Sequence, residues 1–360
     1  MAKKMKRVHI SFSAGETSAW MTYYLLKVKY KCIWNEELQL HVGFDEETQE
    51  EVHVIVTFAN TGQENEETLI FAKKCDEHFG FNTVWLEAIA RFKVGGVIMN
   101  VLENLDKALS TNWFGSRLGT KHRIVDFETA NRDGIVYESI IARYGIPNNA
   151  NSFCTRELKL RPMTSYLRSR KWEANSYYSA IGLRVDEFDR INADYKELKL
   201  FYPAISMKPM TKQQINGFWA LQPFRLMLKG YQGNCKWCFK KHNTKLWQLA
   251  KETPEIFDFP MVMEEKYGNY ITPDRQREMI KKGKEVPVEN ERNYTFFRNN
   301  RSAKDILEAI KRDISEEEGQ RRLKDCKMAL QELDGVKIPF NIIKNYLQPL
   351  SEWLDSEFNT

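Results

Sequence analysis

The first residues in this sequence that could do chemistry are three cysteines. Cys235 and Cys238 form a Cys-x-x-Cys knuckle in GNCKWCFKKH, a spacing that can turn both sulfurs toward one metal ion. Cys154 lies far upstream and could supply a third thiolate. His242, four residues past Cys238, would complete a tetrahedral zinc site. The competing interpretation is three buried thiols that bind nothing.

A second candidate site is a short loop of small residues near the start of the chain. Residues 8–12 alternate as in a β-strand, and residues 17–30 have the apolar spacing of a helix. A loop between a buried strand and a helix presents backbone N–H groups at the positive end of the helix, where they can bind phosphate. On its own such a loop is also an ordinary helix cap. The loop residues are Ser13, Ala14, Gly15, Glu16, Thr17 and Ser18.

Two groups of basic residues could face an anionic ligand. Arg156 and Lys159 are three residues apart, so on a helix both can lie on one face, although a solvated basic face is the alternative. Arg184 and Arg190, with Glu187 between them, follow the apolar strand predicted at 177–182. Open α/β sheets bind ligands at the carboxyl ends of their strands, so these arginines suit phosphate or sulfate.

The elements that must position these residues predict an α/β fold. Strands at 8–12, 52–59 and 84–86, with helices between them, indicate a parallel twisted sheet covered by helices. Residues 31–51 are predicted to be an inserted hairpin or excursion, and residues 91–150 a substrate-side insertion. We expect a nucleotide-binding domain at 1–245 and a mostly helical C-terminal region at 246–360, with residues 303–333 the most helical.

The loop and three later segments together resemble the PAPS-reductase-like adenine-nucleotide hydrolases, the PP-loop ATP pyrophosphatases, and above all their phage- or bacteria-borne type with a Thr variant of the loop. HISFSAGETSA is similar to the family's Ser-Gly-Gly-x-Asp-Ser loop, but Ala14 replaces a glycine and Thr17 replaces the aspartate. VTFANTGQENEETLIF is similar to its second strand and turn. FCTRELKLRPM and AIGLRVDEFDR are similar to its Cys-x-x-Arg-Lys-x-x-Pro and Gly-x-Arg-x-x-Glu-x-x-Arg segments.

This resemblance implies a Rossmann-like sheet of the HUP type that binds ATP or a related adenine nucleotide with Mg²⁺. The loop at 13–18 would hold the phosphates. The adenine would lie against the end of the second strand and its turn, at Phe58, Asn60, Thr61 and Gly62. Arg156, Lys159, Arg184, Glu187 and Arg190 would be the catalytic residues. Thr17 stands where the family has an aspartate that could help hold Mg²⁺. The resemblance therefore supports nucleotide binding more strongly than catalytic turnover.

The resemblance also implies chemistry for the cysteines. Similar tRNA-thiolating enzymes hold a four-iron four-sulfur cluster on three cysteines, and Cys154, Cys235 and Cys238 could do the same, with zinc as the other candidate metal. True sulfonucleotide reductases use a C-terminal Glu-Cys-Gly-Leu-His segment that is missing here, since Cys326 lies in LKDCKMAL. Simple phosphosulfate reduction is therefore disfavoured. We expect adenylation of an acceptor with release of pyrophosphate, linked to sulfur transfer.

Bulk composition restricts the partners. The chain has 360 residues, 42% of them hydrophobic, and a formal charge of +5, which permits an anionic partner without demanding one. The absence of a long apolar run and of a signal peptide predicts a cytoplasmic protein that avoids membranes.

The basic and aromatic segment 229–245 could bind tRNA or DNA, with Trp237 and Phe239 stacking on bases, or could be a solvated loop anchored by those rings. A different function is a nucleotide sensor with structural zinc. The oligomeric state is not predicted.

Overall fold

The computed structural model describes residues 5–94, 96–110, 118–287, 289–291 and 293–311. Its central strand, β1 (Met5–Ser11), pairs in parallel with β4 (Glu50–Asn60) along one edge and with β9 (Tyr178–Ile181) along the other. The sheet continues in parallel from β4 to β5 (Val84–Ile89) and from β9 to β10 (Leu200–Phe201). The chain therefore leaves β1 toward β4 and returns later on the opposite side. This reversal makes the carboxyl ends of β1 and β9 a topological switch point, where such sheets bind ligands.

The eight-stranded sheet is mixed, which corrects the prediction of a purely parallel one. The segment 31–51 contains an antiparallel hairpin, β2 (Ile33–Asn35) and β3 (Leu40–Asp45), and β3 pairs with the first half of β4. On the far edge, β8 (Lys121–Val125) runs antiparallel to β5. A separate two-stranded hairpin consists of β6 (Arg91–Val94) and β7 (Val97–Asn100).

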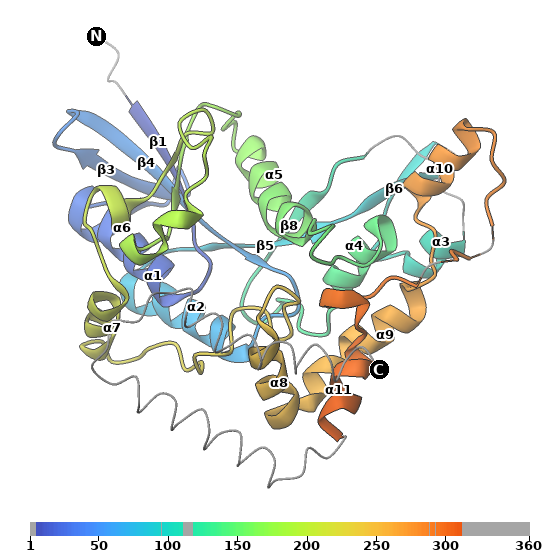
Figure 1. Cartoon of the computed structure of the whole chain (residues 1–360). Helices are drawn as coiled ribbons and strands as arrows, with labels where there is room; N and C mark the ends of the chain where they lie inside the picture. The colour runs from blue at the N-terminus through green and yellow to red at the C-terminus, as the bar shows by residue number, and fades with distance from the viewer. Residues whose placement is uncertain (1–4, 95, 111–117, 288, 292, 312–360) are drawn as a thin grey trace, which may run out of the picture.

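Helices cover both faces of the sheet because the central strands are apolar on both sides. In β4, Val54, Val56 and Phe58 belong to one hydrophobic core, whereas Ile55 and Ala59 belong to another on the opposite face. This division follows from the period of two along a strand. The first face is covered by α1 (Glu16–Tyr23), α2 (Glu66–Phe79) and α7 (Lys212–Ala220), and the second by α5 (Arg161–Ser169) (Figure 1).

The ends of these helices follow ordinary capping rules. Gly80, with φ of 60°, ends α2 in the left-handed conformation that glycine adopts at little cost. Thr211 and Gln214 form a capping box at the start of α7. Further short elements are a π-helical turn after α1 (Tyr24–Lys29), one before α5 (Thr155–Leu160), a 3₁₀ segment (Val185–Arg190) and α6 (Pro203–Ser206).

A third hydrophobic core joins the segment after β5 to the C-terminal helices. It takes residues from α3 (Leu105–Ser110), α4 (Ile135–Tyr144), α8 (Asn243–Glu252), α9 (Asp258–Tyr267), α11 (Ala303–Lys311) and a 3₁₀ turn (Pro254–Phe257). Two further elements of this region are α10 (Pro273–Lys281) and a 3₁₀ turn (Arg298–Asn300). Residues on both sides of position 245 share this core, among them Trp237 and Leu249. The region expected to be helical thus carries α8 to α11, while the rest of 303–333, with Cys326, lies outside the described residues.

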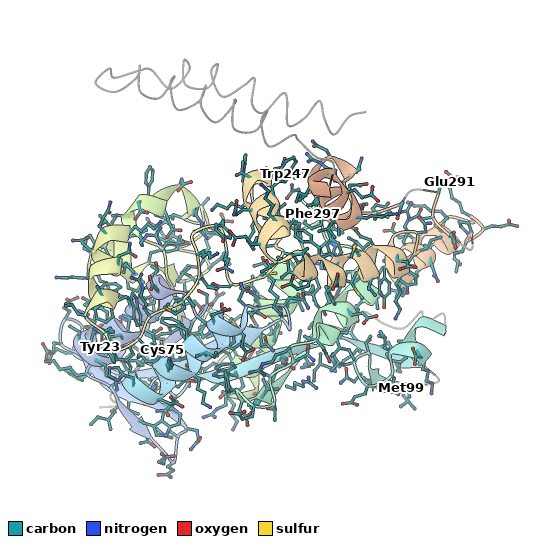
Figure 2. All side chains as sticks on the ribbon, turned by 90° about the horizontal axis from the view of Figure 1, so that it is seen from below. Tyr23, Cys75, Met99, Trp247, Glu291 and Phe297 are labelled. Atoms are coloured by element: carbon teal, nitrogen blue, oxygen red, sulfur yellow. The ribbon has the colours of Figure 1, made fainter. Side chains whose placement is uncertain are left out.

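The first and third cores lie apart. Figure 2 shows Tyr23 and Cys75 at the left, beside the sheet, and Phe297 nearer the centre, beside the C-terminal helices. Among the residues that the structure describes, no helix is both long and apolar enough to cross a membrane.

Candidate functional site

The loop after β1 folds around the hydroxyl of Ser18. The backbone N–H groups of Ser13 and Gly15 donate to Ser18 Oγ at 3.2 and 3.3 Å, and that hydroxyl donates to the Gly15 carbonyl at 2.9 Å. Ala14 is buried with a left-handed φ of 55°, which lets the chain turn sharply into α1. The predicted loop is therefore a tight amide-lined turn at the N-terminus of a helix.

Arg184 connects this loop to the end of β9. Its Nη1 donates to Thr17 Oγ1 at 2.9 Å, and its side chain is 19% exposed. The same guanidinium pairs with Asp186 and, at 3.2 Å, with Glu187, and these carboxylates hold its pKa above the ordinary value. Arg190 pairs with Glu187 and is 61% exposed. Arg184 thus faces the loop directly, while Arg190 reaches the same end of the sheet through Glu187.

Gly182 permits this close approach. A Cβ placed on Gly182 would lie 2.8 Å from Ser18 Cα and 3.1 Å from Ser18 N, closer than carbon atoms can pack. The end of β9 and the first turn of α1 are therefore in backbone contact at the switch point.

Two residues that the sequence analysis missed hold the loop from its other side. Arg225 forms a bidentate pair with the Glu16 carboxylate at 3.1 and 3.2 Å. Trp219 donates from its ring nitrogen to the Glu16 carbonyl at 2.9 Å. Neither residue belongs to a motif, and both are about two hundred positions from the loop, so only the folded chain reveals them.

The second predicted nucleotide segment forms a buried turn. The Asn60 amide donates to Glu87 Oε1 at 2.6 Å and to the Asn131 carbonyl at 2.8 Å. The backbone N–H and hydroxyl of Thr61 donate to Glu64, while Gly62 adopts a left-handed φ of 79°. Phe58 is buried against Trp85. The polar side chains of Asn60 and Thr61 stabilise the turn, and adenine binding here stays a prediction.

The three predicted metal-ligating cysteines gather around one tyrosine. Tyr137 is buried, and its pKa is raised well above the ordinary value, first by burial and then by the nearby thiols of Cys154, Cys235 and Cys238. Burial and the neighbouring Cys238 also raise the pKa of Cys235. The Cys235 thiol is therefore held protonated.

The thiol cluster is not arranged as a metal site in this conformation. Within the described ranges, no group of three or more His, Cys, Asp or Glu side chains could hold a metal ion. His242 caps α8 instead: its Nδ1 accepts from the Thr244 N–H at 3.4 Å and bonds the Thr244 hydroxyl at 2.9 Å. An iron–sulfur cluster or a zinc ion thus stays a prediction, and no chemistry is routed through one below.

The knuckle that carries two of these cysteines contacts the loop after β1. Asn234 donates from its side chain to the Ser13 carbonyl, and the next residue, Cys235, forms an isolated β-bridge with Glu64. Lys159 lies 3.7 Å from Glu64 Oε1, so this predicted residue approaches the turn that the knuckle contacts. The thiol cluster and the loop are therefore joined through Asn234.

The remaining basic residues do not face the loop. Arg156 is 56% exposed and pairs with Glu157. The prediction that Trp237 and Phe239 stack on bases is wrong for this structure, because both rings are buried in the third core at 0% and 1% exposure. Lys241 donates to the carbonyls of Cys235 and Lys236, so it serves as an internal tie of the knuckle.

Comparison with known proteins gives one distant similarity. The chain is 25% identical over 243 residues to the uncharacterized nin region protein ORF290 of Escherichia phage lambda, an alignment covering 68% of this chain and 69% of that protein. No protein-family model matches the chain, and no solved structure is significantly similar. The similarity links the chain to a phage protein and assigns no activity.

The arrangement offers a defined set of chemical groups at one end of the sheet. Amides of the loop and the guanidinium of Arg184 can bind an anion, and the half-buried thiols of Cys235 and Cys238 lie on the adjoining segment. Such a site could bind a polyphosphate ligand close to these cysteine thiols.

Proposed function

We propose that this protein is an adenine-nucleotide-binding enzyme of the PP-loop type that adenylates an acceptor and releases pyrophosphate. The observation that carries the proposal is the contact of Arg184 with Thr17, because it brings the loop after β1 and the arginine after β9 to one side of a switch point. Both segments were predicted from independent motifs. Their meeting supports a single anion site.

The loop would grip the polyphosphate with amides that now bond Ser18. A phosphate oxygen could replace the Ser18 Oγ as acceptor for the N–H groups of Ser13 and Gly15. The positive end of α1 adds attraction for an anion, and Arg184 can exchange its hydrogen bond to Thr17 for one to phosphate.

The reaction would be displacement at the α-phosphorus of ATP. An acceptor oxygen forms a bond to that phosphorus, the bond to the bridging oxygen breaks, and pyrophosphate leaves with the electron pair. Loop amides and Arg184 would stabilise the leaving pyrophosphate. Glu16, the one carboxylate within the loop, is already paired with Arg225, so the loop supplies no unpaired carboxylate and Mg²⁺ would be held by the nucleotide itself.

We propose that the adenylated acceptor is a nucleic acid in the cytoplasm and that it then receives sulfur. The three thiols around Tyr137 support it, since Asn234 places their segment against the loop. Metal analysis of protein purified without oxygen tests the cofactor: iron with absorbance near 400 nm supports a cluster, and colourless protein with zinc supports a structural site.

A second candidate function is nucleotide binding with little turnover, as in a sensor. The observation that favours it is Thr17, a neutral residue bonded to Arg184 where the PP-loop pattern has an aspartate. The two functions differ in pyrophosphate release and agree on nucleotide binding.

Pyrophosphate release from ATP, measured with and without bulk tRNA or DNA, tests the proposal. We expect release that depends on the acceptor and is lost in Arg184→Met, with Gly217→Ala as the control because that glycine faces open space. ATP binding without release would support the sensor. Absence of ATP binding would overturn both.

A further inference from the structure

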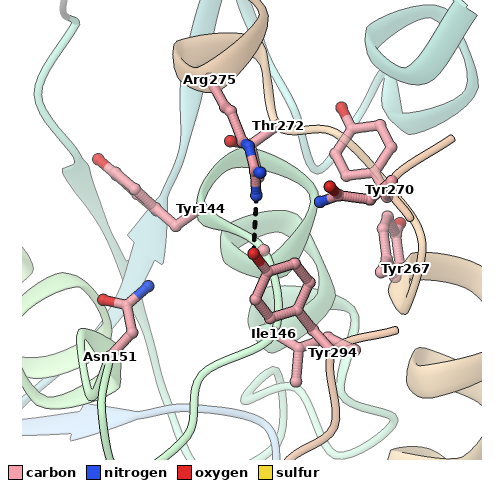
Figure 3. A pocket seen from close by; sticks show the side chains of 10 residues that line it. Tyr144, Ile146, Asn151, Tyr267, Tyr270, Thr272, Arg275 and Tyr294 are labelled. Atoms are coloured by element: carbon pink, nitrogen blue, oxygen red, sulfur yellow. Dashed lines mark hydrogen bonds between the residues drawn. The ribbon is translucent and has the colours of Figure 1, made fainter. Parts of the chain in front are cut away.

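A cavity at the helical end of the molecule has the features of a second ligand site. It has a volume of about 190 Å³ and lies between the end of α4, the end of α9, α10 and the segment around residue 294 (Figure 3). An apolar cavity of about 150 Å³ accepts benzene. This one therefore has room for a somewhat larger ring system.

The walls of the cavity are aromatic. Tyr144, Tyr267, Tyr270 and Tyr294 all line it, and the rings of Tyr267 and Tyr270 meet edge to face at 5.7 Å. The Tyr267 hydroxyl donates to Glu138 at 2.8 Å, so its hydrogen is already used and is not offered to a ligand. Aromatic walls favour a flat ligand that can stack or pack against ring edges.

One hydrogen-bond donor in the wall lacks a partner. The side-chain nitrogen of Asn290 is buried and makes no hydrogen bond to any described residue. A buried amide donor left without an acceptor destabilises the fold. A ligand with an acceptor atom on its edge would remove this cost, which points to a heterocycle.

Arg275 supplies positive charge at the rim. Arg275 is exposed. Its Nη1 donates to the Tyr294 hydroxyl at 2.7 Å, which uses one of the five N–H donors of the guanidinium. No ion pair joins it to a carboxylate within the described residues. A planar guanidinium at the rim of an aromatic cavity suits the phosphate of a ligand whose ring occupies that cavity.

We propose that this cavity binds a nucleobase that carries a phosphate, either as a free mononucleotide or as an exposed nucleotide of a strand. The base would lie among the tyrosines with an acceptor toward Asn290, and its phosphate would meet Arg275. The site is formed by different elements from the phosphate loop. It would therefore bind its ligand whether or not the loop binds ATP.

Calorimetric titration with the four nucleoside monophosphates and their nucleosides tests this site. We expect at least one monophosphate to bind about tenfold more tightly than its nucleoside, and Arg275→Met to abolish that difference. Asn290→Leu should weaken both ligands about tenfold. Arg277→Met is the matched control, because Arg277 lies on the same helix but pairs with Asp274.

Two further measurements identify the ligand source and the location. A 5′-phosphorylated oligonucleotide that binds when the mononucleotides do not, and loses binding in Arg275→Met, supports a strand as the source. Photolabelling with 8-azido-AMP should mark peptides that contain Tyr267, Tyr270 or Tyr294. Labelling confined to other peptides, equal effects of Arg275→Met and Arg277→Met, or no saturable binding at millimolar ligand would overturn the proposal. Arg275→Met removes an exposed side chain and should fold, and unchanged ATP binding in it would separate this site from the phosphate loop.

Discussion

Replacement of Gly182 by alanine should damage the candidate site by a calculable steric route. The new Cβ would lie 2.8 Å from Ser18 Cα and 3.0 Å from Ser18 Cβ. Carbon atoms pack best at about 3.5–4.0 Å, so the end of β9 and the first turn of α1 must separate by roughly 1 Å. Because a backbone and not a flexible side chain is in the way, we expect a loss of about 1–3 kcal/mol in the free energy of unfolding.

The same displacement should weaken nucleotide binding. Ser18 Oγ bonds the loop amides at 3.2 and 3.3 Å, so moving it by that amount breaks the turn that presents them. Urea denaturation would measure stability, and calorimetry with ATP would measure affinity, which we expect to fall at least tenfold.

Gly217→Ala provides the matched control for Gly182→Ala. It lies within α7 with no heavy atom within 4 Å of the added Cβ, so it should raise stability by up to about 1 kcal/mol and leave affinity unchanged. If Gly182→Ala keeps wild-type stability and affinity, β9 does not pack against the loop as described.

Three other changes have defined outcomes. Burial lowers the pKa of His9 to about 4, so the unfolded chain takes up a proton first and the contribution of His9 to stability is lost, by up to about 3 kcal/mol, between pH 6.5 and 4. His9→Gln should remove this contribution, so the variant should lose less stability than the wild type between pH 7 and 4.5 in urea titrations. Burial raises the pKa of Glu264 to about 7, so its contribution is present below pH 4.5 and lost as pH rises to 7, by about 3 kcal/mol at most; Glu264→Gln should remove that loss, and a slope that persists in the variant would contradict the assignment. Asn234→Ala should weaken ATP binding several-fold with little change in melting temperature, because it removes the tie from the knuckle to Ser13; unaltered affinity would mean that the tie is incidental.

The turn at 13–18 and its two flanking elements could be predicted because local signals agree there. Small residues separate an alternating strand from a segment with apolar residues at helical spacing, and these patterns need no distant partner. β4 was equally clear, since its apolar run matches a strand buried on both faces.

The partners that complete the site could not be predicted, because each contact depends on tertiary structure. Arg225 meets Glu16 across 209 positions, and nothing near Arg225 marks it as special. Tyr137 lies in α4, a mostly buried helix with no motif of its own, yet it is close to all three thiols.

The mixed character of the sheet was missed for a related reason. β8 is a short strand with exposed and half-buried residues, so it lacks the apolar signal of an interior strand. It pairs antiparallel with β5. Trp237 and Phe239 likewise resemble surface aromatics in sequence, and only the third core shows that they are buried.

Whether the amides after β1 hold a polyphosphate is tested most directly by comparing ATP with adenosine in calorimetric titrations of the wild type and Arg184→Met. We predict that ATP binds far more tightly than adenosine to the wild type and that the variant loses most of this preference. Equal affinities of the wild type for the two ligands would contradict the phosphate-loop assignment.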